Sequence, residues 1–287
     1  MLEAQVEGRR FTLSRIRNYL RQPHIIISLV LLLLLIFIVI IPFIKMVADS
    51  VIWQYADRRL SRDARPGSLT LFHWKRIFAS NLTQNVLLRP LFNSISTSLG
   101  ISAFAMLIGS LLAWLVVRTD LPGRRGEASL AVIPYVIPSY IHALAWLNLF
   151  KNDRIGGAAG IFQYLFGLSP PNWVSYGYFP IIVTLAIHYF PYTYLLVSAA
   201  LKNIDSRLEE SGEILGASRS YILQRITFPL VLPALLSSFI LTFSRALGIF
   251  CTPYFLGSPV RVFTLTTQIY SNITNRITSS GYILAFV

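Results

Sequence analysis

Charged side chains are scarce in this sequence, and cysteine is almost absent. Only 13% of the 287 residues are Asp, Glu, Lys or Arg, about half the share that a soluble domain carries. The single Cys251 excludes an internal disulfide framework and a cysteine-based metal site. The four histidines show no close metal-ligand spacing. Because 54% of the residues are hydrophobic, the composition predicts one membrane domain rather than two soluble ones.

Acidic residues are the rarest charged class, with 12 Asp and Glu against 25 Lys and Arg, which gives a net charge of +13. Such an excess of positive charge suggests nucleic acid as a partner. No basic patch interleaved with aromatic residues is found, however, and five Arg precede residue 22. Arginines there are typical of a cytoplasmic flank next to anionic lipid. We therefore expect a lipid bilayer, and no nucleic acid, as the partner of the basic segments.

Apolar stretches of the length that a helix needs to cross a bilayer, about 20 residues, recur along the chain. Five qualify: 25–44, 93–117, 128–150, 178–201 with a possible entry loop from 174, and 229–252. The first has too long an apolar region for a cleaved signal peptide, so we expect a retained helix. A sixth stretch begins near Tyr282 and is cut off at Val287. The spans predict an all-α, polytopic transmembrane helical bundle.

These spans divide the chain into a basic tail 1–24, a first helix 25–44, a loop 45–92 and a core 93–287. Within the long loop, residues 69–79 predict a short amphipathic helix, with aromatic residues at the membrane interface and Lys75 and Arg76 in water. The segments on the two sides of the membrane contain equal numbers of Lys and Arg. The segments on the side of the N-terminus are shorter, so their positive charge is denser, and Arg118, Arg124 and Arg125 lie in one short loop there. We therefore expect a cytoplasmic N-terminus, a periplasmic loop 45–92 and a cytoplasmic loop 202–228.

Two features inside the spans are candidates for a translocation path. Pro134 and Pro138 lie one turn apart, and each removes a backbone hydrogen bond and kinks a helix. The freed carbonyls suit a water-lined path, although a simple packing kink is an equal alternative. Arg245 is a charge within a span, which fits contact with an anionic substrate, or with an anion accompanying iron(III), as well as it fits a snorkelling side chain. Tyr192 lies in an aromatic group with His188 that suits packing or the path.

The charged stretch 208–229 lies between two of the most apolar segments. Asp205 is a good N-cap, so a helix is expected from Ser206 to Leu215, ending at Gly216 in the left-handed conformation. Ser218 would cap a second helix that enters the fifth span at Pro229. The stretch has no phosphate-binding loop and no nucleophile beside a base, so it predicts no catalysis. From the residues alone, a docking surface and a solvated connector remain equally open.

The spacing in this stretch resembles the EAA loop of binding-protein-dependent ABC importer permeases. Glu210 takes the Glu position, Ser211 and Gly212 replace two Ala, and Gly216 takes the Gly position. After nine residues follow Ile226, with Phe228 for Leu, and then Pro229. The segments "IPYVIPSYIHALAWLNLF" and "TPYFLGSPVRVFTLTTQIY" are similar to later parts of these permeases, the second to the iron(III) and 2-aminoethylphosphonate branches. The resemblance covers roughly residues 70–287.

The resemblance implies an ABC importer permease fold and a loop that couples the chain to an ATPase. The implied coupling residues are Glu209, Glu210, Ser211, Gly212, Gly216, Ala217, Ile226 and Pro229. The implied partners are a cytoplasmic ABC ATPase dimer that holds ATP and Mg, a periplasmic substrate-binding protein, and a second permease core, fused or separate. The chain would then lie in a bacterial inner membrane, hydrolyse nothing and bind no cofactor or metal of its own.

For the solute we expect iron(III), with 2-aminoethylphosphonate, thiamine and polyamines as alternatives. Two rivals belong to other classes: an ATP-independent secondary transporter or channel, in which 208–229 is only a connector, and a membrane-anchored structural or assembly protein. Since permeases of this type complete their last helix, and the iron(III) branch often fuses two cores, we expect the chain to be the first half of a longer protein or a truncated form.

Overall fold

The computed structural model describes residues 22–61, 64–120, 126 and 129–287, and throughout these ranges the regular structure is helical. The tail to residue 21 and the pair Arg124 and Arg125, both used above to predict the topology, lie outside the described residues. Within them, four helices are long and apolar enough to cross a membrane: Pro23–Ser50, Gln84–Arg118, Asn172–Asn203 and Arg219–Leu247. They correspond to the first, second, fourth and fifth predicted spans.

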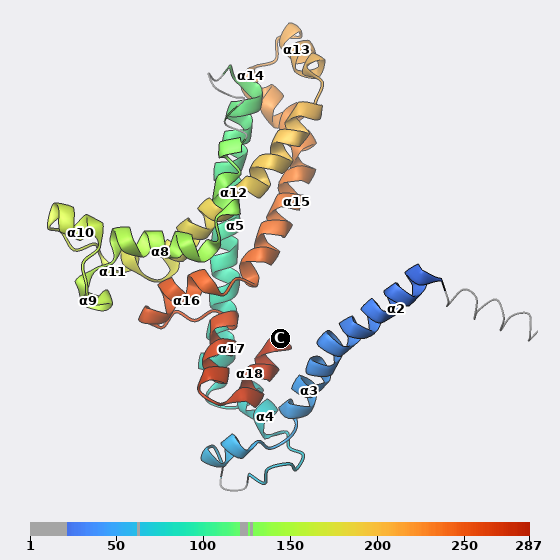
Figure 1. Ribbon diagram of the computed structural model, residues 1–287. Coiled ribbons are helices and arrows are strands. Elements are labelled where there is room, and N and C mark those ends of the chain that lie inside the picture. The colour runs from blue at the N-terminus through green and yellow to red at the C-terminus, as the bar shows by residue number, and fades with distance from the viewer. Residues whose placement is uncertain (1–21, 62–63, 121–125, 127–128) are drawn as a thin grey trace, which may run out of the picture.

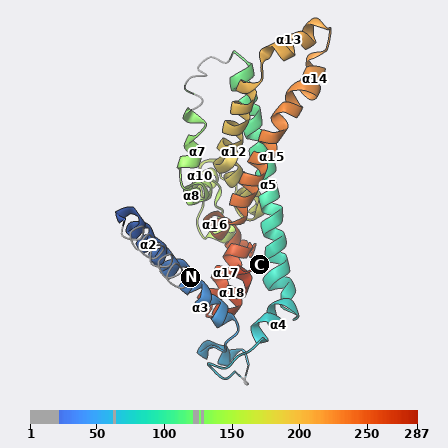
Figure 2. The same cartoon turned by 90° about the vertical axis from the view of Figure 1, so that its right-hand side faces the viewer.

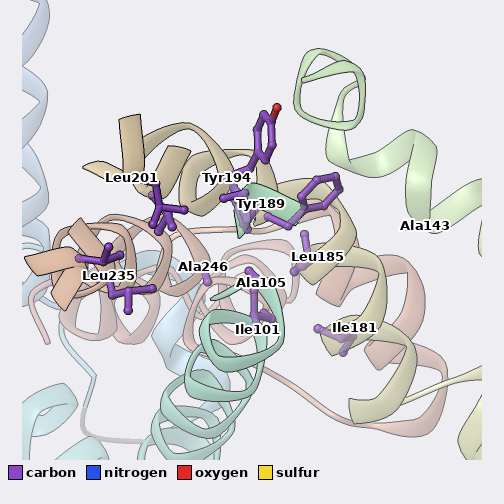
Figure 3. Close-up of a cluster of buried hydrophobic side chains, with 14 of the residues drawn as sticks. Ile101, Ala105, Ala143, Ile181, Leu185, Tyr189, Tyr194, Leu201, Leu235 and Ala246 are labelled. Carbon is purple, nitrogen blue, oxygen red and sulfur yellow. The ribbon is translucent and has the colours of Figure 1, made fainter. Parts of the chain in front are cut away.

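The bundle is centred on α12 (Tyr178–Asn203), which packs against α5 (Arg89–Arg118) and α15 (Phe228–Leu247), and these two helices also pack against each other (Figure 1). In the most apolar window of the α12 segment 67% of the residues are buried, against 28% in the segments of its two neighbours. Figure 3 shows the shared core, which includes Ile101 and Ala105 of α5, Leu185 of α12 and Leu235 of α15. A bilayer cannot supply a hydrophobic force between helices, so close packing must hold them together.

Gly109 is where α5 and α12 approach most closely. A Cβ atom added there would lie 2.6 Å from the carbonyl oxygen of Phe190 and 2.9 Å from the backbone nitrogen of Tyr194. Backbone atoms cannot move aside as a flexible side chain can. Glycine at this position is therefore what allows the two longest helices of the core to touch.

In three of the long helices a short π turn precedes a proline. Short π-helical turns, η1 (Ile36–Ile40), η3 (Gln84–Leu88) and η4 (Leu223–Thr227), lead into α3 (Ile41–Ser50), α5 and α15. Each of these three helices has a proline as its second residue: Pro42, Pro90 and Pro229. Proline lacks the N–H of the regular α-helical bond and crowds the preceding turn, and a wider turn just before it accommodates that defect.

The third predicted span, 128–150, is not one continuous helix: its described part is interrupted at Pro138, the second of the two prolines at which a kink was predicted. Its described part contains α7 (Ile133–Val136) and α8 (Ser139–Phe150), separated by extended backbone at Ile137 and Pro138. Proline pushes the residue before it out of the helical region, and here no π turn absorbs the defect. Figure 1 shows that α8 then runs across the bundle axis instead of along it.

The first helix, formed by α2 (Pro23–Leu35), η1 and α3, stands apart from the bundle in both views (Figures 1 and 2). None of its most apolar window is buried. Among the described residues, its C-terminal part α3 meets α18, where the rings of Phe43 and Phe286 lie 5.9 Å apart, edge to face. Its apolar surface is therefore free for lipid or for another protein.

The loop after the first helix folds around two short elements, η2 (Tyr55–Arg59) and α4 (Phe72–Phe78). The short helix within 69–79 was predicted, but the burial of its His73 was not. His73 is fully buried, its Nε2 lies 3.1 Å from Oδ2 of Asp57, and its ring contacts Trp53 and Phe72. This buried pair ties α4 to the loop.

The chain between the ends of the spans forms shorter helices. Beyond α8 lie α9 (Asp153–Gly156), α10 (Ile161–Phe166) and α11 (Asn172–Ser175). The fifth span ends at Leu247 rather than near residue 252, and is followed by α16 (Cys251–Gly257), η5 (Ser258–Val260), α17 (Leu265–Thr274) and α18 (Thr278–Ala285). Figure 1 places α17 beside the N-terminal half of α5, at the end of the bundle opposite α13 (Ser206–Ile214).

Candidate functional site

The first half of the charged loop is α13, and its two ends are fixed as predicted. The Asp205 carboxylate accepts a hydrogen bond from the backbone N–H of Arg207 at 3.0 Å. At the other end Gly216 has a φ of +79°, its N–H donates to the Glu213 carbonyl, and the N–H of Ala217 donates to the Gly212 carbonyl, both at 3.0 Å. This pair of bonds is the Schellman C-cap, which requires a left-handed residue at its turn.

The second half of the loop is continuous with a span. The Ser218 hydroxyl caps α14 (Arg219–Ile222), accepting from the N–H of Tyr221 at 3.3 Å. From Arg219 the helix runs through η4 and past Pro229 to Leu247. The predicted second helix is therefore confirmed, and it forms one rod with the fifth span.

Packing between the two halves explains the small residue at 212. A Cβ atom added to Gly212 would lie 3.1 Å from Ile222 and 3.5 Å from Ile226, within contact of their side chains. Gly212 thus lets α13 lie directly against the start of the rod. Ser211 is exposed, and its hydroxyl donates to the carbonyl of Arg207 at 2.6 Å.

The two neighbouring glutamates differ in environment. Glu209 is partly buried: its Oε1 accepts from the Thr227 hydroxyl at 2.8 Å and lies 3.2 Å from Nη2 of Arg118 as an ion pair. Glu209 therefore joins α13 to the end of α5 and to η4, and we call these three residues the Glu209 clamp. Glu210, the residue at the Glu position of the motif, is exposed.

The tip of α13 carries two apolar residues that the sequence reading did not single out. Ile214 and Leu215 are 85% and 86% exposed. Both precede the Gly216 turn in an otherwise polar helix, and that contrast was a signal in the sequence. Exposed apolar side chains at the tip of a rigid turn are suited to contact with another protein.

Two of the predicted path residues, Pro134 and Pro138, lie at the break between α7 and α8. The Nδ1–H of His188 donates to the carbonyl of Pro134 at 3.0 Å, and the Thr252 hydroxyl donates to that of Ser139 at 3.1 Å. Side chains of α12 and α16 thus satisfy carbonyls near the broken helix. Pro138 itself makes the break and leaves α8 free to turn across the bundle.

Around this break lies a cluster of aromatic rings with one cation. The Tyr135 ring lies 4.7 Å from that of Tyr192 and 5.6 Å from that of His188, whose ring is 5.3 Å from that of His142. Arg245 is exposed and within electrostatic reach of the Tyr192 hydroxyl, which is hydrogen-bonded with Tyr135. Tyr192 therefore lies within the electrostatic field of Arg245.

The sequence reading missed Tyr135 and treated His142 and His188 separately. Tyr135, His142 and His188 lie on α7, α8 and α12. Spacing along the chain therefore gave no signal that these side chains meet. Within the described residues there is no group of three or more His, Cys, Asp or Glu side chains able to hold a metal ion. The cluster presents hydroxyl and imidazole hydrogen-bonding groups, and Arg245 adds a guanidinium charge.

Comparison with known proteins places this arrangement in a family. Residues 105–287 match the model of the binding-protein-dependent transport system inner membrane component family. Relatives include a ferric transport system permease protein of Actinobacillus pleuropneumoniae, 29% identical over 180 residues, which are 61% of this chain and 26% of that protein. A molybdenum transport system permease protein of Escherichia coli is 28% identical over 202 residues, covering 68% of this chain and 86% of that protein.

A sulfate transport system permease protein of Salmonella typhimurium is 28% identical over 168 residues, 58% of each chain. The chain thus spans about a quarter of the length of the ferric relative and more than half that of the sulfate relative.

Solved structures show the same fold. A bacterial ABC transporter that imports the acidic polysaccharide alginate matches with a TM-score of 0.65 at 17% identity, covering 95% of this chain and 92% of that one. The methionine ABC transporter in an inward-facing conformation matches with a TM-score of 0.51 at 20% identity, over 71% and 90% of the two chains. The helical membrane bundle predicted from the sequence is confirmed, and the chain belongs to the family of binding-protein-dependent transport system inner membrane components.

Proposed function

We propose that this chain is the transmembrane permease subunit of an ATP-driven importer, seated in a bacterial inner membrane with its N-terminus in the cytoplasm. The observation that carries the proposal is the rigid connection between α13 and the fifth span. Gly212 packs α13 onto the rod 219–247, and the Glu209 clamp fixes the same helix to α5. A helix held in this way transmits a rigid-body motion from a cytoplasmic partner to the bundle.

The partner we propose at α13 is a cytoplasmic ABC ATPase dimer, which would hold the ATP and Mg. Glu210 faces solvent and Ile214 and Leu215 project at the turn, so they are suited to enter a groove of that partner. A periplasmic binding protein and a second permease core, fused or separate, would complete the assembly. One related alginate transporter is known in complex with its periplasmic protein, which supports the kind of partner proposed.

Iron(III) is the solute we propose first, because ferric transport permeases are among the relatives and a C-terminal segment resembles that branch. Sulfate and molybdate permeases are about equally similar to the chain, which makes an oxyanion the second candidate. The exposed guanidinium of Arg245, which acts electrostatically on Tyr192, favours an anion, so iron(III) would pass this point together with an anionic ligand.

The coupling proposal is tested at Gly216. Proline fixes φ near −65° and has no N–H, so Gly216→Pro cannot keep the +79° turn or its bond to Glu213. Asn tolerates the left-handed region, so Gly216→Asn is the matched control. We expect Gly216→Pro and the charge reversal Glu210→Lys to abolish copurification with the ATPase and solute uptake, and Gly216→Asn to retain both. Unchanged association and uptake in Gly216→Pro would favour an ATP-independent transporter or a structural protein.

A further inference from the structure

A hollow of about 740 Å³ opens at the end of the bundle opposite α13. It lies between the start of α5, the start of α12 and the segment that leads into α17. With the topology proposed above, this is the periplasmic mouth. The polar and charged residues that line the hollow are Asn85, Arg89, Asn93, Tyr178, Arg261 and Gln268.

The charge of the hollow has one sign. Arg89 and Arg261 are both exposed, and no Asp or Glu is among the lining residues. A guanidinium presents its N–H groups as a planar fork that matches the oxygens of a carboxylate, sulfate or phosphate. Two such groups facing one hollow attract an anion and repel a bare metal cation.

Hydrogen bonds hold the walls of the hollow in place. The Tyr178 hydroxyl donates to Oδ1 of Asn93 at 2.5 Å, and Nδ2 of Asn93 donates to the carbonyl of Phe263 at 2.7 Å. The N–H of Leu265 donates to the Ser94 hydroxyl at 2.8 Å. Three segments far apart in the sequence are thereby fixed around the two arginines.

Arg261 itself is held in an unfavourable backbone conformation. Its φ is +57°, in the left-handed region that favours glycine, and its N–H donates to the carbonyl of Ser258 at 3.1 Å. A glycine would form this turn without strain, whereas an arginine strains the backbone there. The side chain of Arg261 is therefore present although the backbone conformation disfavours it. Strained residues of this kind cluster at ligand sites.

We propose that this hollow binds an oxyanion group of the transported solute at the periplasmic mouth, before the solute reaches Arg245. The inference rests on the proposed transport function and adds the class of solute. Free iron(III) would not enter, whereas iron(III) carried with an anionic ligand, or an oxyanion by itself, would. The phosphate of an anionic lipid offers the same chemistry, so the experiment must separate the two sources.

The test uses the whole transporter, assembled with its partners in phosphatidylcholine nanodiscs that contain no anionic lipid. Binding of sulfate, molybdate and phosphate is measured by equilibrium dialysis at low ionic strength. We expect Arg89→Gln and Arg261→Gln each to raise the Kd of the bound oxyanion about tenfold or more, as loss of a charge-assisted contact does. Arg58→Gln is the control for general surface charge, because Arg58 of η2 is exposed but does not line the hollow.

Arg261→Gly separates folding from binding, because glycine suits the φ of +57°. We expect this variant to assemble normally and still lose the affinity. The lipid is tested in a second set of nanodiscs that contain phosphatidylglycerol. If wild-type protein binds none of the three anions but retains phosphatidylglycerol through Arg89 and Arg261, the assignment to solute is overturned.

Equal binding by wild type and the Arg89→Gln, Arg261→Gln double variant would overturn the site altogether. In either case, a transporter that still assembles and hydrolyses ATP would support the proposed coupling function. Failure of the oxyanion site can therefore be distinguished from failure of the coupling function.

Discussion

Replacing Glu209 by Ala tests whether α13, the proposed coupling helix, is anchored to the bundle as the structure indicates. The change removes the ion pair with Arg118 and the hydrogen bond from Thr227. The side chains of Glu209 and Arg118 are 23% and 15% exposed, so water screens this pair less than a surface pair. A hydrogen bond to a charged group contributes about 1.5–3 kcal/mol, and an exposed ion pair up to about 1 kcal/mol.

Because water partly replaces both interactions, we expect Glu209→Ala to lower the free energy of local opening of α13 by about 2 kcal/mol. That corresponds to amide hydrogen exchange about 30-fold faster in residues 206–216, provided that the helix recloses faster than it exchanges. Glu209→Gln keeps an acceptor for Thr227 and loses only the charge, so we expect an effect of about threefold. Hydrogen exchange followed by mass spectrometry measures both.

The matched control is Glu213→Ala on the same helix. Its carboxylate lies 3.7 Å from Nε of Arg219, but the two side chains are 55% and 95% exposed, so their ion pair contributes almost nothing. The reasoning is refuted if Glu213→Ala accelerates exchange as much as Glu209→Ala. It is also refuted if Arg118→Ala adds its full effect to that of Glu209→Ala, since partners in one clamp must be non-additive.

Two further predictions concern packing and pH. Gly109→Ala should lower the free energy of unfolding by about 2 kcal/mol, as overpacking of a core usually does, because the new methyl group would lie 2.6 Å from the backbone of α12. The melting temperature in detergent should fall accordingly. Gly248→Ala is the control: its nearest neighbour is 4.0 Å away, so the melting temperature should not change. Burial holds the pKa of His73 below its ordinary value of 6.5 despite the nearby Asp57 carboxylate, so the unfolded loop takes up a proton first. The loop should have its full stability above pH 6.5 and lose stability as the pH falls through the lowered pKa of His73. The fluorescence of Trp53 and Trp74 should report this loss. In His73→Gln the fluorescence should depend less on pH.

The local elements of the coupling loop were predicted from the sequence. Asp205, Ser218 and Gly216 act on backbone groups only a few residues away, so their roles depend on nearest neighbours along the chain. The spacing from Glu210 to Pro229 also carried the family resemblance, which comparison with known proteins confirmed. The role of Glu209 was not distinguished from that of Glu210, because its partner Arg118 lies on another helix.

The third span shows where local rules became insufficient. Proline signals a defect in a helix, but Pro42, Pro90 and Pro229 are accommodated by π turns while Pro138 breaks its helix. A full break of this kind is tolerated only where partners on other elements satisfy the carbonyls near it. Near Pro138 those partners are His188 and Thr252, from α12 and α16.

The sequence by itself determined that this protein is a helical membrane bundle, where the capped helix α13 begins and ends, and to which family it belongs. Apolar length, helix caps and a glycine turn are short-range properties, and they persist in any arrangement of the spans. Tertiary structure alone decided that Tyr192 packs against Tyr135, that Glu209 is clamped, and that Arg89 and Arg261 line one hollow. These groups are brought together by the packing of helices far apart in the chain, and spacing along the sequence does not encode that geometry.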